Sequence, residues 1–157
     1  MKRREFIVLL GSAALAPIPA RAGSEGAASV AARLVGTWRF VSSMSTRSDG
    51  TTFDRWGNGA QGTLMFDARG AFAQIIVGEE SRMFGGKSIF AFGTYVVDEE
   101  NSTIALHTQA SSNPKQTGHK QRRIIVSMTT DELKLINPVS TSGNQVETLW
   151  RRAKPGS

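Results

Sequence analysis

The sequence predicts an all-β domain: an eight-stranded antiparallel up-and-down β-barrel preceded by one short helix. Short segments with alternating apolar residues recur after residue 36, and clusters of Gly, Asn, Asp and Ser separate them. Links of hairpin length favour antiparallel neighbours, and eight strands can close around side chains or one small ligand. Closure would also remove exposed strand edges, and an open β-sandwich is the alternative.

The first 22 residues, MKRREFIVLLGSAALAPIPARA, are expected to be a cleaved export signal. A basic start, a short apolar middle and the closing Ala-Arg-Ala predict cleavage after Ala22. The Arg3-Arg4 pair resembles a twin-arginine signal, so we expect a periplasmic or secreted protein. A retained membrane anchor and an N-terminal helix of the mature domain are the alternatives.

The remainder is expected to form a single domain of ordinary size. We assign residues 23–29 to a flexible tether, 30–153 to the barrel and 154–157 to a disordered tail. The chain has no cysteine, so neither disulfides nor a thiol nucleophile are available. Half of the formal net charge of +6 lies in the signal, and the mildly basic remainder argues against nucleic-acid binding. No second apolar run is long enough to span a bilayer, so no membrane insertion is expected after cleavage.

The predicted elements follow one another with recognisable ends. Apolar residues at helical spacing predict a helix within AASVAARLVG, which Gly36 ends. Chain reversals are expected at DARG, DEENS, TTDE and STSGN, where turn-forming residues cluster. The predicted strands span residues 37–45, 61–67, 71–78, 89–98, 102–110, 119–129, 132–137 and 145–152.

The segment LVGTWRFVS resembles the opening of barrels in the lipocalin superfamily. The order of WGNGAQGTLMF, GTYVVD, GHKQRR, DELKL and LWRR is similar to that of the bacterial lipocalin-like domain family. This resemblance implies a barrel in which Trp38 plugs the closed end and a basic residue of the last strand covers its ring. The candidate cations are Arg151 and Arg152, and Gly36 would leave room where the helix meets the first strand.

Alternation assigns the side chains of each strand to two faces, but it leaves open which face lines the lumen. On the first strand, Trp38, Phe40 and Ser42 are expected to point inward. The candidate ligand-binding residues are Gln74, His107, Gln121, Arg123, Phe92 and Phe40. If they share the lumen, they form a mostly apolar cavity with a few polar groups, which is typical of small-molecule sites. Alternatively, the polar members face solvent.

Arg123 is the most informative of these candidates. Its guanidinium could hold a carboxylate by two hydrogen bonds, and His107 could donate another. A buried arginine without a partner is costly, so Glu147 or a ligand would have to accompany it inside the barrel.

These observations favour a barrel that binds one small apolar or amphipathic molecule. One alternative is an enzyme of the cyclase or isomerase type, with His107 as general base and Arg123 as electrostatic stabiliser. Another is a protein-interaction module with an apolar patch near Met83 and Phe84, a pair that could instead form a lid. No cofactor is expected. His107 and His119 lack further ligands at the spacing of a metal site. His107 alone could ligate a haem iron, but a single histidine is usually only a hydrogen-bonded side chain. The sequence leaves the ligand and the oligomeric state open.

Overall fold

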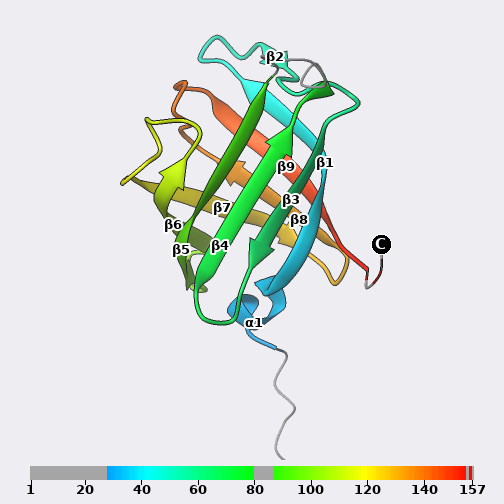
Figure 1. Cartoon of the computed structure of the whole chain (residues 1–157), viewed down its shortest axis with the longest axis vertical. Coiled ribbons are helices and arrows are strands. Elements are labelled where there is room, and N and C mark those ends of the chain that lie inside the picture. Colours follow the sequence, from blue (N-terminus) through cyan, green and yellow to red (C-terminus); the bar gives the residue numbers. More distant parts are fainter. Residues whose placement is uncertain (1–27, 80–86, 155, 157) are drawn as a thin grey trace, which may run out of the picture.

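The computed structural model describes residues 28–79, 87–154 and 156, which form a closed antiparallel β-barrel (Figure 1). Helix α1, Val30–Leu34, leads directly into the first strand. The strands are β1 Gly36–Thr46, β2 Thr52–Phe53, β3 Gln61–Phe66, β4 Ala71–Val77, β5 Ser88–Asp98, β6 Thr103–Ser111, β7 Lys120–Met128, β8 Glu132–Asn137 and β9 Gln145–Arg152. The predicted fold class is confirmed. The predicted signal, residues 1–22, and the Met83-Phe84 pair lie outside the described residues.

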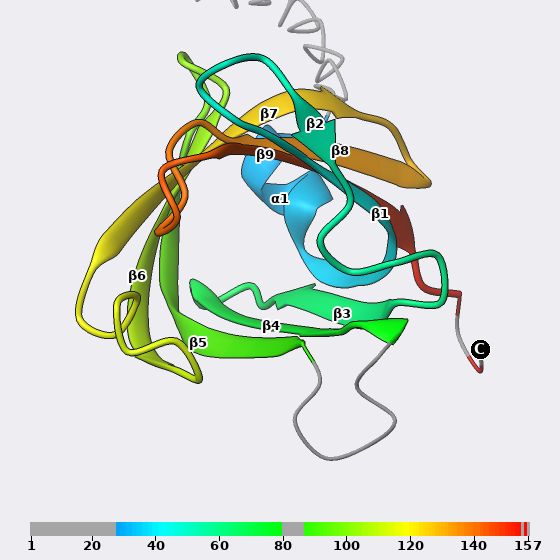
Figure 2. The ribbon, with the colours of Figure 1, turned by 90° about the horizontal axis from the view of Figure 1, so that it is seen from above.

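Eight of the strands form the ring of the barrel. From β3 onward each strand pairs with the next, and β1 pairs with both β3 and β9, which closes the sheet. Figure 2 shows these strands around one interior, and Figure 1 shows α1 at the end opposite β2. Strand β2 was not predicted, because it has only two residues and pairs only with the end of β1.

A β-bulge in β1 changes which side chains point inward. The pairing of β1 with β9 shifts between Phe40 and Ser42, so one extra residue enters β1 at this point. Beyond the bulge, Ser43 and Ser45 are buried, while Ser42 is exposed. The prediction that Ser42 points inward is therefore wrong.

The end of the barrel beside α1 is closed by Trp38 and Arg152. The indole is fully buried, and its Nε1 donates a hydrogen bond of 2.9 Å to the carbonyl of Leu34. The guanidinium carbon of Arg152 lies 4.0 Å from the centroid of the Trp38 ring. Its nitrogens also donate to the carbonyl oxygens of Arg33, Val35 and Thr130. The last strand is thereby joined to α1 and to the turn before β8.

Gly36 is required where α1 meets β1. Its φ of 133° is a conformation that other residues rarely adopt, and a Cβ there would lie 2.7 Å from Nη1 of Arg152. Arg151, the other predicted plug cation, points away from the plug and pairs with Glu132 at 3.3 Å. The structure therefore places Arg152, and not Arg151, over Trp38.

Apolar side chains fill the barrel above this plug. The largest fully buried residues include Trp38, Leu64, Ile104, Leu133 and Trp150. The described part of the chain contains no helix with the length and apolar character needed to cross a membrane. Beyond this packed part of the barrel, a cavity lies toward the other end.

Candidate functional site

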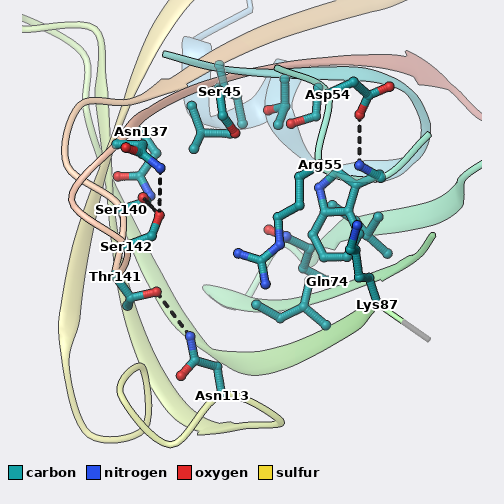
Figure 3. Close-up of a pocket in the computed structure, with 18 of the residues that line it drawn as sticks. Ser45, Asp54, Arg55, Gln74, Lys87, Asn113, Asn137, Ser140, Thr141 and Ser142 are labelled. Atoms are coloured by element: carbon teal, nitrogen blue, oxygen red, sulfur yellow. Dashed lines mark hydrogen bonds between the residues drawn. The ribbon is translucent and has the colours of Figure 1, made fainter. Parts of the chain in front are cut away.

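The end of the barrel opposite α1 holds a cavity of about 370 Å³, shown in Figure 3. At ~30 Å³ for each water-sized group, this volume accommodates about twelve non-hydrogen atoms. Apolar side chains, including Ile76, Leu135, Val146 and Trp150, form part of its wall. Polar side chains, including Ser43, Gln74, Asn113, Arg123 and Asn137, form the rest. A partly apolar cavity with a few polar groups suits one small amphipathic molecule.

Arg123 is the central charged residue of this wall. The pairing of β6 with β7 places it opposite Ile104, which is fully buried, so both side chains point into the barrel. Its Nη2 donates to Oε1 of Gln121 at 2.7 Å, and its Nη1 donates to the carbonyl of Arg122 at 3.2 Å. The amide of Asn137, with its oxygen toward the guanidinium, accepts from Nη1 at 3.3 Å.

None of these groups neutralises the Arg123 charge. Within the described ranges, no carboxylate lies within 4.0 Å of the guanidinium, and Glu147 instead pairs with Lys134 at 3.2 Å. Enclosure by the protein lowers the pKa of Arg123 to about 10, because removal from water disfavours the charged form. The guanidinium therefore stays cationic at neutral pH and can accept an anionic partner.

The mouth of the cavity adds positive charge. Arg55 and Lys87 line it together with one carboxylate, that of Asp54. Figure 3 shows Arg55 directed into the cavity, and its guanidinium carbon lies 5.2 Å from the centroid of the Trp56 ring. Asp54 accepts hydrogen bonds from the backbone of Trp56 and Gly57, at 2.8 Å and 3.2 Å. Among the described lining residues, cations thus outnumber carboxylates, which favours an anionic ligand.

Four of the six predicted ligand-binding residues point toward the interior. Gln74 and Arg123 line the cavity itself. Gln121 holds Arg123 by its hydrogen bond. Phe40 packs edge-on against Trp150, with ring centroids 5.4 Å apart, and so supports a residue of the cavity wall. Whether these residues bind a ligand stays a prediction.

Two of the six candidate residues, His107 and Phe92, lie on the outer face of the barrel and not in its lumen. His107 is exposed and alternates with Leu106 and Thr108, which are buried. Phe92 is 51% exposed, while its neighbours Ala91 and Gly93 face inward. Alternation could not assign the face of Phe92, because both faces of its strand are apolar. It could not separate His107 from Arg123, because the pairing of β6 with β7 cannot be read from either strand alone.

The enzyme hypothesis built on His107 and Arg123 is not supported by this geometry. The two side chains lie on opposite faces of the barrel wall, because Arg123 is paired with Ile104, an odd number of residues from His107. No bound atom inside the barrel can contact both. The described residues also contain no group of three or more His, Cys, Asp or Glu side chains arranged to hold a metal ion.

Phe92 belongs to an apolar area on the outer face of β4 and β5. It pairs with Ala73, and the exposed Phe90 pairs with the exposed Ile75. The interaction-module hypothesis had expected such an area near residues 83 and 84, which are not described. The structure places exposed apolar side chains on the strands themselves.

Several lining residues were not predicted. Ser43 and Ser45 were missed because of the bulge in β1, which alternation alone does not reveal. Arg55, Asn113 and Ser140 lie in links between strands, which reach the cavity only when the barrel closes. The polar and aromatic composition of TFDRWGNG was the one sequence feature that could have indicated a contribution from the first link.

No family model and no curated protein matches this sequence. Among solved structures, a de novo designed fluorescence-activating β-barrel is 17% identical, with a TM-score of 0.48 over 81% of this chain and 100% of that chain. A redesigned β-barrel is also 17% identical, with a TM-score of 0.47 and the same shares covered. Bovine odorant-binding protein, in complex with a selenium-containing odorant, is 20% identical, with a TM-score of 0.46 over 85% of this chain and 78% of that chain. The strand pairing of this chain defines a closed eight-stranded β-barrel. The candidate site is described from the residues of this chain alone.

Proposed function

We propose that this protein binds one small amphipathic carboxylate in the open end of its barrel. The observation that carries the proposal is Arg123, a cation on the cavity wall without a carboxylate partner in the described chain. A carboxylate accepts two parallel hydrogen bonds from a guanidinium, which suits this group. The apolar part of the ligand would contact Leu135 and Trp150.

The expected gain in binding free energy is sufficient for the site to prefer an anionic ligand. A hydrogen bond to a charged group contributes about 1.5–3 kcal/mol, which corresponds to about tenfold or more in affinity. The exposed cation at the mouth, Arg55, would also favour the approach of an anion. Arg123 thus determines the ligand class, and the cavity volume limits its size.

The test compares two ligands of similar size and opposite charge, decanoate and decan-1-amine. Decanoate has about the twelve non-hydrogen atoms that the cavity holds at ~30 Å³ each. Trp56 and Trp150 line the cavity, so their fluorescence should change on binding. We expect saturable binding of decanoate and little binding of the amine. Equal binding of both, or of neither, would contradict the proposal. Native mass spectrometry of protein isolated from its own host would search for the natural ligand.

We further propose that the protein works outside the cytoplasm, after cleavage at Ala22. The support is the sequence pattern of residues 1–22, with its basic start and Arg3-Arg4 pair. Replacing both arginines, Arg3→Lys with Arg4→Lys, should leave the uncleaved protein in the cytoplasm. Cell fractionation with N-terminal sequencing measures this, and cleaved, exported protein in the variant would exclude the twin-arginine route.

A further inference from the structure

We infer that the ligand carries a second, uncharged hydrogen-bonding group, separated from its carboxylate by an apolar segment. A hydroxyl or carbonyl group is the chemistry expected, with Ser43 and Gln74 as its partners. The inference rests on the proposed function, since it takes the carboxylate to lie at Arg123.

Ser43 is the first observation. The residue lines the cavity and is 4% exposed, and its Oγ has no hydrogen-bond partner. Among the described residues, it is the one buried side-chain polar atom left in this state. The cross-strand neighbour of Ser43, Thr148, already has another partner, because its Oγ1 accepts a hydrogen bond of 2.9 Å from Nε1 of Trp150. Buried hydroxyl groups normally have a partner, and rotation about χ1 allows Ser43 to turn toward one.

Gln74 is the second observation, and it comes from a different strand. The side chain lines the cavity from β4, between the buried residues Phe72 and Ile76. No described group forms a hydrogen bond with its amide, which can donate two and accept others. Gln74 is half-buried, so its amide is open to the cavity and available to a polar group of a ligand.

The ring of strands places these two residues across the lumen from Arg123. In the order β1-β3-β4-β5-β6-β7-β8-β9, the Arg123 strand β7 is three strands from β4 in one direction and three strands from β1 in the other. A carboxylate held at Arg123 therefore directs the rest of the ligand toward Ser43 and Gln74. The cavity volume limits the distance between the two polar ends to that of a molecule with about twelve non-hydrogen atoms, at ~30 Å³ each.

The test uses two probes that differ by a terminal CH₃ or OH, decanoate and 9-hydroxynonanoate. They have the same number of non-hydrogen atoms. The ratio of their affinities, that of the hydroxy acid divided by that of decanoate, therefore reports the terminal group alone. For the wild-type protein, calorimetry should show the hydroxy acid binding about tenfold more tightly, because a site built for a hydrogen bond discriminates against a ligand without it. In the double variant Ser43→Ala with Gln74→Leu, the preference should reverse while decanoate still binds.

Two controls isolate the effect. Ser42→Ala changes the exposed neighbour of Ser43 and should leave the affinity ratio unchanged. If the double variant is poorly folded by circular dichroism, the single variants Ser43→Ala and Gln74→Met replace it, and each should lower the ratio.

The outcomes separate this inference from the proposed function. A wild-type preference for decanoate, or a ratio that the double variant leaves unchanged, overturns the inference. If decanoate binding is lost in Arg123→Gln while the ratio shows no discrimination, carboxylate binding stands and the second group is excluded. If neither acid binds the wild-type protein, both proposals fall.

Discussion

Two arginines of this barrel, Arg152 at the plug and Arg123 at the cavity, differ in what covers their guanidinium groups. Arg152 lies against the indole of Trp38 and donates to three main-chain carbonyls. Arg123 donates to two side-chain amides and to the carbonyl of Arg122. Neither arginine has a carboxylate partner in the described chain, but the Trp38 ring covers the guanidinium of Arg152, whereas Arg123 lines the cavity. The difference suggests that Arg152 serves stability and that Arg123 serves binding.

The largest expected effect is the loss of stability in Arg152→Met. The substitution removes the cation–π contact with Trp38 and leaves three carbonyl oxygens without their donor. Charged hydrogen bonds and partly buried cation–π contacts of this kind predict a decrease of about 3–5 kcal/mol in the free energy of unfolding. Urea unfolding measures it, with Arg151→Met as the control, since that exposed ion pair should contribute less than about 1 kcal/mol. Equal effects of the two substitutions would remove the distinction between the two arginines of the last strand.

A second prediction concerns the glycine that accommodates Arg152. Gly36→Ala combines an unfavourable φ with a close contact to Nη1 of Arg152, so it should lower the free energy of unfolding by about 1–3 kcal/mol. Gly118→Ala is the matched control, because Gly118 also has a positive φ, 78°, but no atom lies within 4 Å of its added Cβ. If thermal unfolding shows the two variants to be equally stable, crowding by Arg152 contributes nothing.

A third prediction uses the pH dependence of decanoate binding. The pKa of Arg123 is lowered to about 10, so its charge is present below that pH and is lost as the pH rises through it. The carboxylate of decanoate is charged above a pKa close to the ~4.3 of a glutamate side chain. Affinity should therefore be constant between about pH 6 and 9 and decrease on both sides. Arg123→Gln should abolish the decrease in affinity near pH 10. If this decrease is unchanged in the variant, another titrating group causes it.

The smallest expected effect is that of Arg55→Gln at the mouth. Arg55 is exposed and has no carboxylate partner in the described chain, so it should aid the approach of an anion without fixing its position. The association rate for decanoate should decrease about two- to threefold at low salt and converge with the wild-type rate at high salt. Stopped-flow fluorescence measures this, and a large change in the dissociation rate would instead place Arg55 in direct contact with the ligand.

The strands were predictable because their pattern is local. Alternating apolar residues between turn sequences identified all eight strands of the ring, with each predicted end within one residue of the observed end. The turn at DARG shows why, since Oδ1 of Asp67 accepts from the backbone nitrogens of Arg69 and Ala71, within the same few residues. Such contacts depend on neighbouring residues alone.

The site was less predictable because it depends on pairing between strands. Gln74, Arg123 and His107 were candidates for one shared face that alternation left open, but the structure places Gln74 and Arg123 inward and His107 outward, and the β6–β7 register that separates them was unknown. Ser43 was missed for a related reason, since one extra residue in β1 reverses the alternation after Phe40. Neither the register nor the bulge has a signature within the strand that carries it.

The most direct test of this account measures Arg123→Gln twice, by calorimetry with decanoate and by urea unfolding without ligand. We expect at least about tenfold weaker binding, because the charged hydrogen bonds to the carboxylate are lost. We also expect a free energy of unfolding equal to or above that of the wild-type protein, because an enclosed cation without a carboxylate partner is removed. Undiminished affinity together with a marked loss of stability would show that Arg123, like Arg152, is a structural residue, and would contradict the account.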